Sequence, residues 1–444
     1  MKHIFIALVC ASFVSVNAYA NTTQTTVIAS TNATDQLSPA LPNPESIPAK
    51  PSTSAAQFKQ ASKKTSSNPD ISLILDGLYA SKDGSNELPG FQLAGEAAES
   101  AEKGFSLGHT ELAISSNIDD KFYGKMTAAI HEHDGETELE VEEAFVETTA
   151  LGQGVTIRGG RMLTATSYHN SQHQHAWDFA DAPLISKGLW GNSHIDDGLR
   201  VSWVAPTDTL VEVGTEALTG RAFPSGEKSD GLGAHTVFAN VGGDLSESSS
   251  WQMGVSHFRT KPKNRSAASA HAHAHEEDEH EEDEHEEEAP ASFSGKSHTT
   301  GVSAIYKWAP NGNYKNKHVK LQTEYMIRKE DGNVSHGDHS DLINGTQKGF
   351  YVQGVYQFQP NWRAGLRYDQ VQSKFSGEDE AIEEAGLDNE GMTPKRYTAS
   401  LEYVPSEFSR VRLQYNKDES SDESDDQVML QYTMSLGPHG AHSF

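Results

Sequence analysis

From residue 71 onward, apolar and polar residues alternate along segments of about ten residues. In 318–329, Val319, Leu321 and Tyr325 share one face, and Lys320 and Glu324 share the other. Side chains of a β-strand point alternately to its two faces, so such segments predict strands with one apolar and one polar face. About ten residues is also the length with which a tilted strand crosses a bilayer. The pattern therefore predicts an all-β fold, a transmembrane antiparallel β-barrel.

The alternation predicts sixteen strands, an even number typical of single-chain bacterial barrels. They are expected at 71–81, 105–116, 121–131, 137–148, 154–163, 197–205, 208–219, 235–243, 250–260, 298–309, 318–329, 349–359, 361–374, 395–404, 407–416 and 427–436. Long connections are expected at 82–104, 164–196, 220–234, 261–297, 330–348 and 375–394. The remaining connections are short, and long extracellular loops with short periplasmic turns are the arrangement of outer-membrane barrels.

The first seventy residues differ from the rest in composition. Residues 1–20 have the basic start, apolar run and Ala18-Tyr19-Ala20 cleavage site of a signal peptide, whose removal would take away Cys10, the single cysteine. Residues 21–70 are rich in Thr, Ser, Ala and Pro and are expected to be a flexible periplasmic segment. Residues 25–29 resemble the short box of TonB-dependent receptors, with a chance match as the alternative. Residues 71–444 are then the barrel.

Charge and hydropathy narrow the classes of function. The formal net charge of −28 makes nucleic acid an unfavourable partner and favours cations at the surface. Low mean hydropathy without a second long apolar run excludes a helical membrane protein. Enzyme motifs are poor: Gly104-Phe105-Ser106-Leu107-Gly108 matches G-x-S-x-G, but it starts a predicted strand rather than a strand–turn–helix. We therefore expect no enzyme activity and no catalytic residue.

The most specific chemical feature is the tract 271–288, in which eighteen residues include five histidines and eleven carboxylates. Imidazole and carboxylate together suit borderline divalent ions, zinc first and copper or nickel as alternatives. The candidate ligands here are His271, His273, His275, His280, His285, Glu276, Glu277, Asp278, Glu279 and Asp283. The competing interpretation is a solvated acidic tract without a specific ligand. Several weakly bound, exchanging zinc ions, carried as cargo, are expected.

The connection 164–196 is the second candidate region. Its His169, His173 and His175 are further candidate metal ligands, and its Asp178 and Asp181 are candidate pore-lining acids. Basic residues expected on the inner strand faces are Arg158, Arg200, Arg328, Arg363, Arg367, Arg396, Arg410 and Arg412. An acidic loop opposite this basic wall would create a transverse field. Alternatively, the arginines pair with the inward Glu212, Glu216, Glu324 and Glu402, and an anion-selective pore also stays open.

As a whole, residues 71–444 resemble the general porins, and 271–288 resembles the histidine-rich outer-membrane proteins associated with zinc uptake, some labelled zinc-regulated receptors. The porin resemblance implies an inward-folded constriction loop at 164–196 and a homotrimer. Phe444 resembles the C-terminal signal read by the outer-membrane assembly machinery, although 437–443 separates it from the last strand. The expected function is a channel in the outer-membrane lipid that captures divalent metal. The alternatives are a surface metal buffer or adhesin, an anion-selective porin, or a reduced TonB-linked zinc receptor.

Overall fold

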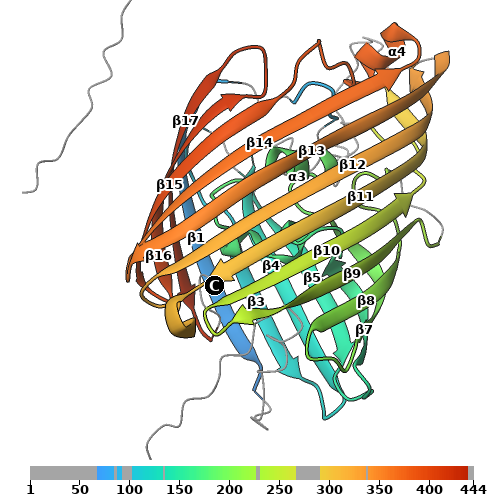
Figure 1. Cartoon of the computed structure of the whole chain (residues 1–444). Helices are drawn as coiled ribbons and strands as arrows, with labels where there is room; N and C mark the ends of the chain where they lie inside the picture. Colours follow the sequence, from blue (N-terminus) through green and yellow to red (C-terminus); the bar gives the residue numbers. More distant parts are fainter. Residues whose placement is uncertain are drawn as a thin grey trace, which may run out of the picture. The chain divides into compact units, whose positions relative to one another are not determined.

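The structure is a computed structural model, and it describes residues 68–84, 88–92, 103–133, 136–226, 231–266, 291–336 and 339–438. The predicted signal peptide, most of the segment 21–70, the tract 271–288 and Phe444 lie outside these ranges. The described part of the chain forms one antiparallel sheet of strongly tilted strands (Figure 1).

The strands follow the chain in order around the sheet. They are β1 (Asp70–Ser81), β2 (Gly104–Ser106), β3 (Thr110–Asn117), β4 (Phe122–His133), β5 (Glu136–Thr148), β6 (Val155–Leu163), β7 (Ile195–Val204), β8 (Leu210–Leu218), β9 (Ala234–Ser246), β10 (Ser249–Thr260), β11 (Ser292–Trp308), β12 (His318–His336), β13 (His339–Gln359), β14 (Trp362–Ser376), β15 (Lys395–Ser406), β16 (Ser409–Glu419) and β17 (Asp425–Leu436). β1 pairs with β17 and also with β2 and β3, so the sheet closes on itself. Because β2 and β3 together form one interrupted position beside β1, the result is a closed sixteen-strand barrel, as predicted.

Burial alternates along the strands in the sense of a membrane barrel. On β12, Lys320 and Glu324 face inward and are almost fully buried, while Leu321 and Tyr325 are 48% and 41% exposed. β17 repeats the pattern, with Gln431 buried and Leu430 exposed. A polar interior and an apolar exterior invert the soluble arrangement, and a closed barrel leaves no unpaired edge in lipid. The chain is a β-barrel of the outer membrane, and the predicted faces of β12 and β17 are confirmed.

One predicted connection is wrong. Residues 330–348 were expected to form a loop, but β12 and β13 continue through them and pair from His318↔Gln357 to His336↔His339. The hairpin tip still lies far beyond the apolar zone of these strands. A strand can continue where its outward side chains become polar, because the hydrogen bonds to its partner strand continue. The prediction placed the strand ends where the apolar alternation stops, and it therefore made these two strands too short.

Two irregularities interrupt the strands near the chain's beginning. Leu78 of β1 lies opposite Ser106, and Ile74 of β1 lies opposite Glu111. A step of four residues along β1 thus corresponds to a step of five residues from β2 to β3. On β5, Glu142 is the extra residue, because Thr127 pairs with Glu143 but the next residue of β4 pairs with Val141. Such bulges turn an additional side chain toward one face. The predicted single strand 105–116 is therefore two strands.

The connection 164–194 folds into the barrel, as the predicted constriction loop would. It contains two short 3₁₀ turns, η1 (His169–Ser171) and η2 (Gln174–Ala176), and the helix α3 (Leu184–Trp190), which lies against β13 and β14 inside the barrel (Figure 1). Further short helices are η4 (Pro310–Gly312) and α4 (Asp379–Glu384). Within the described ranges, no helix is both long and apolar enough to cross a bilayer.

Candidate metal centre

The inward loop meets the bulged strands at a group of buried histidines and carboxylates. We call this group the His–Glu cluster; it consists of His109, Glu111, Glu142, Glu143, His173 and His175. His109 and Glu111 come from the β2–β3 bulge and the start of β3, Glu142 and Glu143 from the β5 bulge, and the remaining two histidines from η1–η2 of the loop. The cluster therefore joins three segments that are distant in the sequence.

The glycine before His109 makes the first bulge. Gly108 has φ +57°, a left-handed conformation that side chains disfavour, and a Cβ there would lie 2.6 Å from Asp76 Oδ2. That same carboxylate accepts a hydrogen bond from the His109 backbone N–H at 3.3 Å. Because Phe105 faces outward at 87% exposure, an uninterrupted strand would also have turned His109 and Glu111 outward. The bulge reverses their orientation into the lumen.

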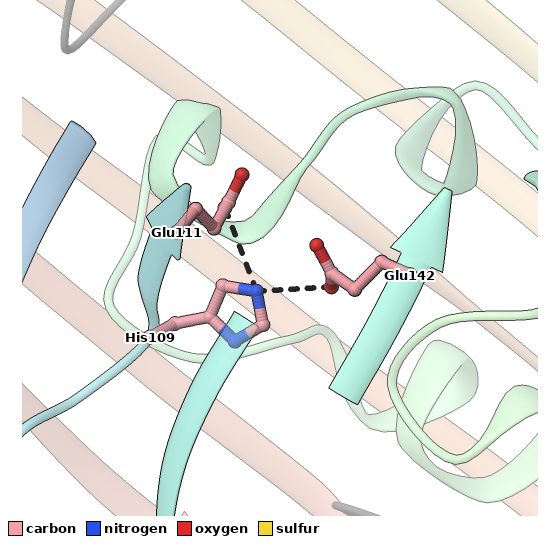
Figure 2. Close-up of side chains that lie close together, drawn as sticks. All are labelled: His109, Glu111 and Glu142. Carbon is pink, nitrogen blue, oxygen red and sulfur yellow. Dashed lines mark hydrogen bonds and ion pairs between the residues drawn. The ribbon is translucent and has the colours of Figure 1, made fainter. Parts of the chain in front are cut away.

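The donor atoms of the cluster are closely spaced. His109 Nε2 lies 3.0 Å from Glu142 Oε1 and 3.5 Å from Glu111 Oε1 (Figure 2). His175 Nδ1 lies 2.6 Å from Glu111 Oε1. Zinc ligands at 2.0–2.2 Å in a tetrahedron are roughly 3.3–3.6 Å apart. The donors of His109, Glu111 and Glu142, which all lie within 4.8 Å of one another, match the spacing of a tetrahedral site after small side-chain movements.

Two buried polar atoms in the cluster have no hydrogen bond to any described residue. Glu142 Oε2 and His173 Nδ1 are 3.3 Å apart, so they form an ion pair when the ring is protonated, but neither makes a hydrogen bond of acceptable geometry. Unsatisfied buried polar atoms are costly and call for an explanation by strain, function or a bound ion or water. Their position beside His109 and Glu111 is consistent with a cation-binding function, and the chemistry of the donor set fits zinc.

The charge balance of the cluster is dominated by its carboxylates. Lys125 on β4 donates to Glu143 at 2.6 Å, and His173 Nε2 lies 2.8 Å from the same carboxylate. Burial favours the neutral ring of His173, but the carboxylates of Glu111 and Glu143 outweigh it and raise its pKa to about 10. For His175, burial outweighs Glu111 and lowers the pKa. Without a metal ion, a protonated His173 thus compensates part of the negative charge.

The opposite side of the loop is bound to the wall by ion pairs. Asp178 lies 2.9 Å from Lys320 of β12, and Asp181 lies 2.8 Å from Arg367 and 3.0 Å from Arg396. These basic residues hold the pKa values of both aspartates low despite burial. The predicted acidic loop and basic wall are thus in direct contact, so these pairs attach the loop rather than face each other across a gap.

The other predicted arginines are shared between the loop and the wall. Arg412 donates to the Trp177 carbonyl oxygen and to Glu402, and Arg328 donates to the Leu189 carbonyl oxygen. On the other wall, Arg158 pairs with Glu147, and Arg200 pairs with Glu216. The alternative prediction, in which arginines pair with inward glutamates, is therefore correct for Glu216 and Glu402. Glu324 instead accepts from the His169 N–H and the Tyr351 hydroxyl, and Glu212 from Asn240.

The predicted histidines of the loop separate into two groups. His173 and His175 join the cluster, whereas His169 stacks on Trp177 with ring centroids 4.4 Å apart. Burial lowers the pKa of His169 to about 3, so its ring is neutral. The candidate ligands in 271–288 lie outside the described residues. Sequence reasoning missed His109, Glu111, Glu142 and Glu143, and the only signal for them was the doubled glutamate on a strand, which breaks the alternation.

Comparison with known sequences finds a relative but no family model. No protein-family model matches this chain. An uncharacterized protein of Aquifex aeolicus (strain VF5) is 27% identical over 393 residues, which cover 85% of this chain and 80% of that protein. Its name assigns no activity.

Solved outer-membrane proteins overlap with most of the barrel. A loop L8 deletion mutant of OmpT from Vibrio cholerae gives a TM-score of 0.48 at 10% identity, covering 83% of this chain and 99% of that chain. The anion-selective porin from Comamonas acidovorans gives 0.47 at 9% identity and also covers 83% and 99%. Similarity at this level carries no argument about the transported solute, and the barrel is established by this chain's own strand pairing.

Proposed function

We propose that this protein is an outer-membrane channel that takes up divalent metal, zinc by its donor chemistry, through the His–Glu cluster. The observation that carries the proposal is the burial of His109, Glu111 and Glu142 with donor atoms at ligand spacing, beside an inward loop that supplies His173 and His175. The porin resemblance adds a homotrimer to this proposal.

The cluster and the tract 271–288 would have different roles in uptake. The tract, with five histidines among eleven carboxylates, suits capture of several weakly held ions outside the barrel. The cluster offers one desolvated site, where fewer and fixed donors favour one ion at a time. The three glutamates of the cluster outnumber its cationic groups, Lys125 and protonated His173, and so attract a divalent cation. Release of the ion toward the periplasm requires that the loop or its histidines move.

Calorimetric zinc titration of the folded, full-length protein in detergent tests the proposal. A variant lacking residues 270–288 should lose the weak ions and keep about one tighter site per chain. Adding Glu142→Gln and His109→Gln to that deletion should abolish this remaining site, because both groups would be ligands. His169→Gln is the matched control, since that histidine is as buried as His109 but lies in the inward loop outside the cluster.

Zinc binding that survives the double substitution in a folded barrel would reject the cluster as the site. Transport is tested separately by zinc flux into liposomes that contain the protein. A folded protein that binds zinc but supports no flux would favour the buffer or adhesin alternative. An apparent preference for chloride in planar bilayers would favour the anion-selective alternative.

A further inference from the structure

The outer surface of the barrel carries a row of basic residues at the end with the long connections. In direct cross-strand register across β9 to β14, the outward residues are His235, Arg259, His298, Lys329, Thr346 and Lys374. Lys348 lies one outward position from this row, opposite Ile327. We call Arg259, Lys329, Lys348 and Lys374 the basic row. In a chain with a net charge of −28, such a concentration of positive charge requires an explanation.

The basic row is not neutralised by the described part of the chain. No ion pair joins Lys329, Lys348 or Lys374 to a carboxylate there. Arg259 donates to the neighbouring His257 Nε2 at 2.9 Å instead of to an acid. His298 lies between Arg259 and Lys329 in the register, and Thr346 lies between Lys329 and Lys374. The fixed charges of this line therefore stand two strands apart, roughly 10 Å, with polar side chains between them.

The outward lysines of the next two strands, β15 and β16, differ from the basic row because they have a carboxylate partner. Lys395 of β15 and Lys417 of β16 also lie on the outer surface near the same end, but both contact Glu419, at 3.0 Å and 2.8 Å. Their charge is therefore compensated within the protein. This difference along one rim separates a paired segment from the basic row, and it supplies a matched control.

Lys348 of the basic row lies at the depth of lipid headgroups. Phe350 is the next outward residue below Lys348, roughly 7 Å along the strand, and its ring packs against Tyr368 at 5.9 Å. Tyr368 in turn packs on Tyr397 at 5.0 Å. Aromatic girdles of this kind mark the boundary between the hydrocarbon and headgroup regions. Next along the same outward faces, Val352 follows Phe350 on β13 and Leu366 follows Tyr368 on β14, and both are exposed in the apolar belt.

We infer that the basic row binds the phosphate groups of a phosphorylated glycolipid, such as lipid A, in the outer leaflet. The three lysines face away from the lumen, Lys348 lies directly outside the aromatic girdle, and no ion pair joins any of them to a carboxylate of the described residues. A lipid with two phosphates can contact lysines on different strands of the row at once. Lysine and arginine near an anionic lipid surface each contribute roughly a factor of five in binding.

Native mass spectrometry of the folded, full-length protein, titrated with diphosphoryl lipid A in detergent, tests this inference. The triple variant Lys329→Gln, Lys348→Gln and Lys374→Gln should weaken lipid A binding by about tenfold or more. The control Lys395→Gln with Lys417→Gln should change it by less than about twofold, because those residues are occupied by Glu419. Heat-modifiable migration on gels verifies that each variant is folded.

Four outcomes would overturn the inference. The triple variant binds lipid A like the wild type, or both variants lose binding equally, or inorganic phosphate at millimolar concentration displaces the lipid. The third result would assign the row to free phosphate. Binding that appears only after deletion of residues 270–288 would also contradict it, since the acidic tract itself would then occupy the basic row.

Discussion

The wall formed by β12 to β17 and the wall formed by β2 to β5 follow different rules. In the first, the register shifts lie beside the short turns, at Gln357 and Tyr403, and the strands alternate regularly elsewhere. Inward basic residues of this wall such as Lys320, Arg367 and Arg396 bind the loop. In the second, two bulges place acidic residues and a histidine where regular strands would not. The regular wall holds the loop in position, and the irregular wall supplies the chemistry that the loop completes.

The largest expected effect breaks the attachment to the regular wall. Asp181→Ala removes a buried carboxylate that both Arg367 and Arg396 contact, and Asp369 remains beside the two arginines. The substitution also removes an acceptor of Gln414 and Asn416. The loss of several buried hydrogen bonds to one charged group should cost about 3–5 kcal/mol in the free energy of unfolding. Urea titration followed by gel migration measures the loss, and trypsin cleavage after Lys187 reports release of the loop. Asp197→Ala is the control, since its pair with Arg161 is about one-third exposed and should contribute less than about 1 kcal/mol. A loop that stays protected in Asp181→Ala would contradict this role of the regular wall.

The second prediction concerns the irregular wall. Gly108→Ala forces a side chain into a left-handed position and against the Asp76 carboxylate, so we expect a loss of about 2–4 kcal/mol. It should also weaken zinc binding, because His109 and Glu111 depend on the bulge. Gly354→Ala on the regular β13 is the matched control: its Cβ would meet only the movable end of Leu321 at 3.0 Å, and we expect less than about 1 kcal/mol. Equal effects of the two substitutions would remove the distinction between the walls.

The smallest effect is a pH dependence at the end of the loop. His194 is fully buried, hydrogen-bonds to Thr164 Oγ1 through Nδ1, and packs on Trp190 and Phe258. Burial, opposed by Glu216 and assisted by Arg328, lowers its pKa to about 4. In the unfolded chain this histidine has a pKa of about 6.5. Between about pH 6.5 and pH 4 it is therefore protonated in the unfolded chain but neutral in the folded protein, so the free energy of unfolding falls as the pH decreases.

Between pH 7.5 and pH 5.5 this histidine should account for about 1 kcal/mol of lost stability. The measurement is the difference in unfolding free energy between the two pH values, for the wild type and for His194→Gln, which should remove the loss. His339→Gln, at the exposed hairpin tip, should leave the pH dependence unchanged. An identical pH dependence in all three proteins would show that His194 does not carry the effect.

The sequence by itself determined the barrel. Alternation between a lipid-facing and a lumen-facing side is imposed on every residue of a membrane strand, so it is visible in segments such as 318–329 without knowledge of their partners. For the same reason the inward orientation of Arg328, Arg367 and Arg412 was predictable. The inward loop was also expected, and its His173 and His175 were recognised as candidate ligands before their partners were known.

Only the tertiary structure decided which groups meet. A bulge is an exception to alternation that depends on the register of the neighbouring strand, and one residue of shift reverses a side chain's face. The shifts at Gly108 and Glu142 therefore turned His109, Glu111 and the paired glutamates inward against the expectation from a regular strand. Likewise, the unpaired lysines of the basic row and the paired ones beside Glu419 look alike in the sequence, because cross-strand distances alone distinguish them.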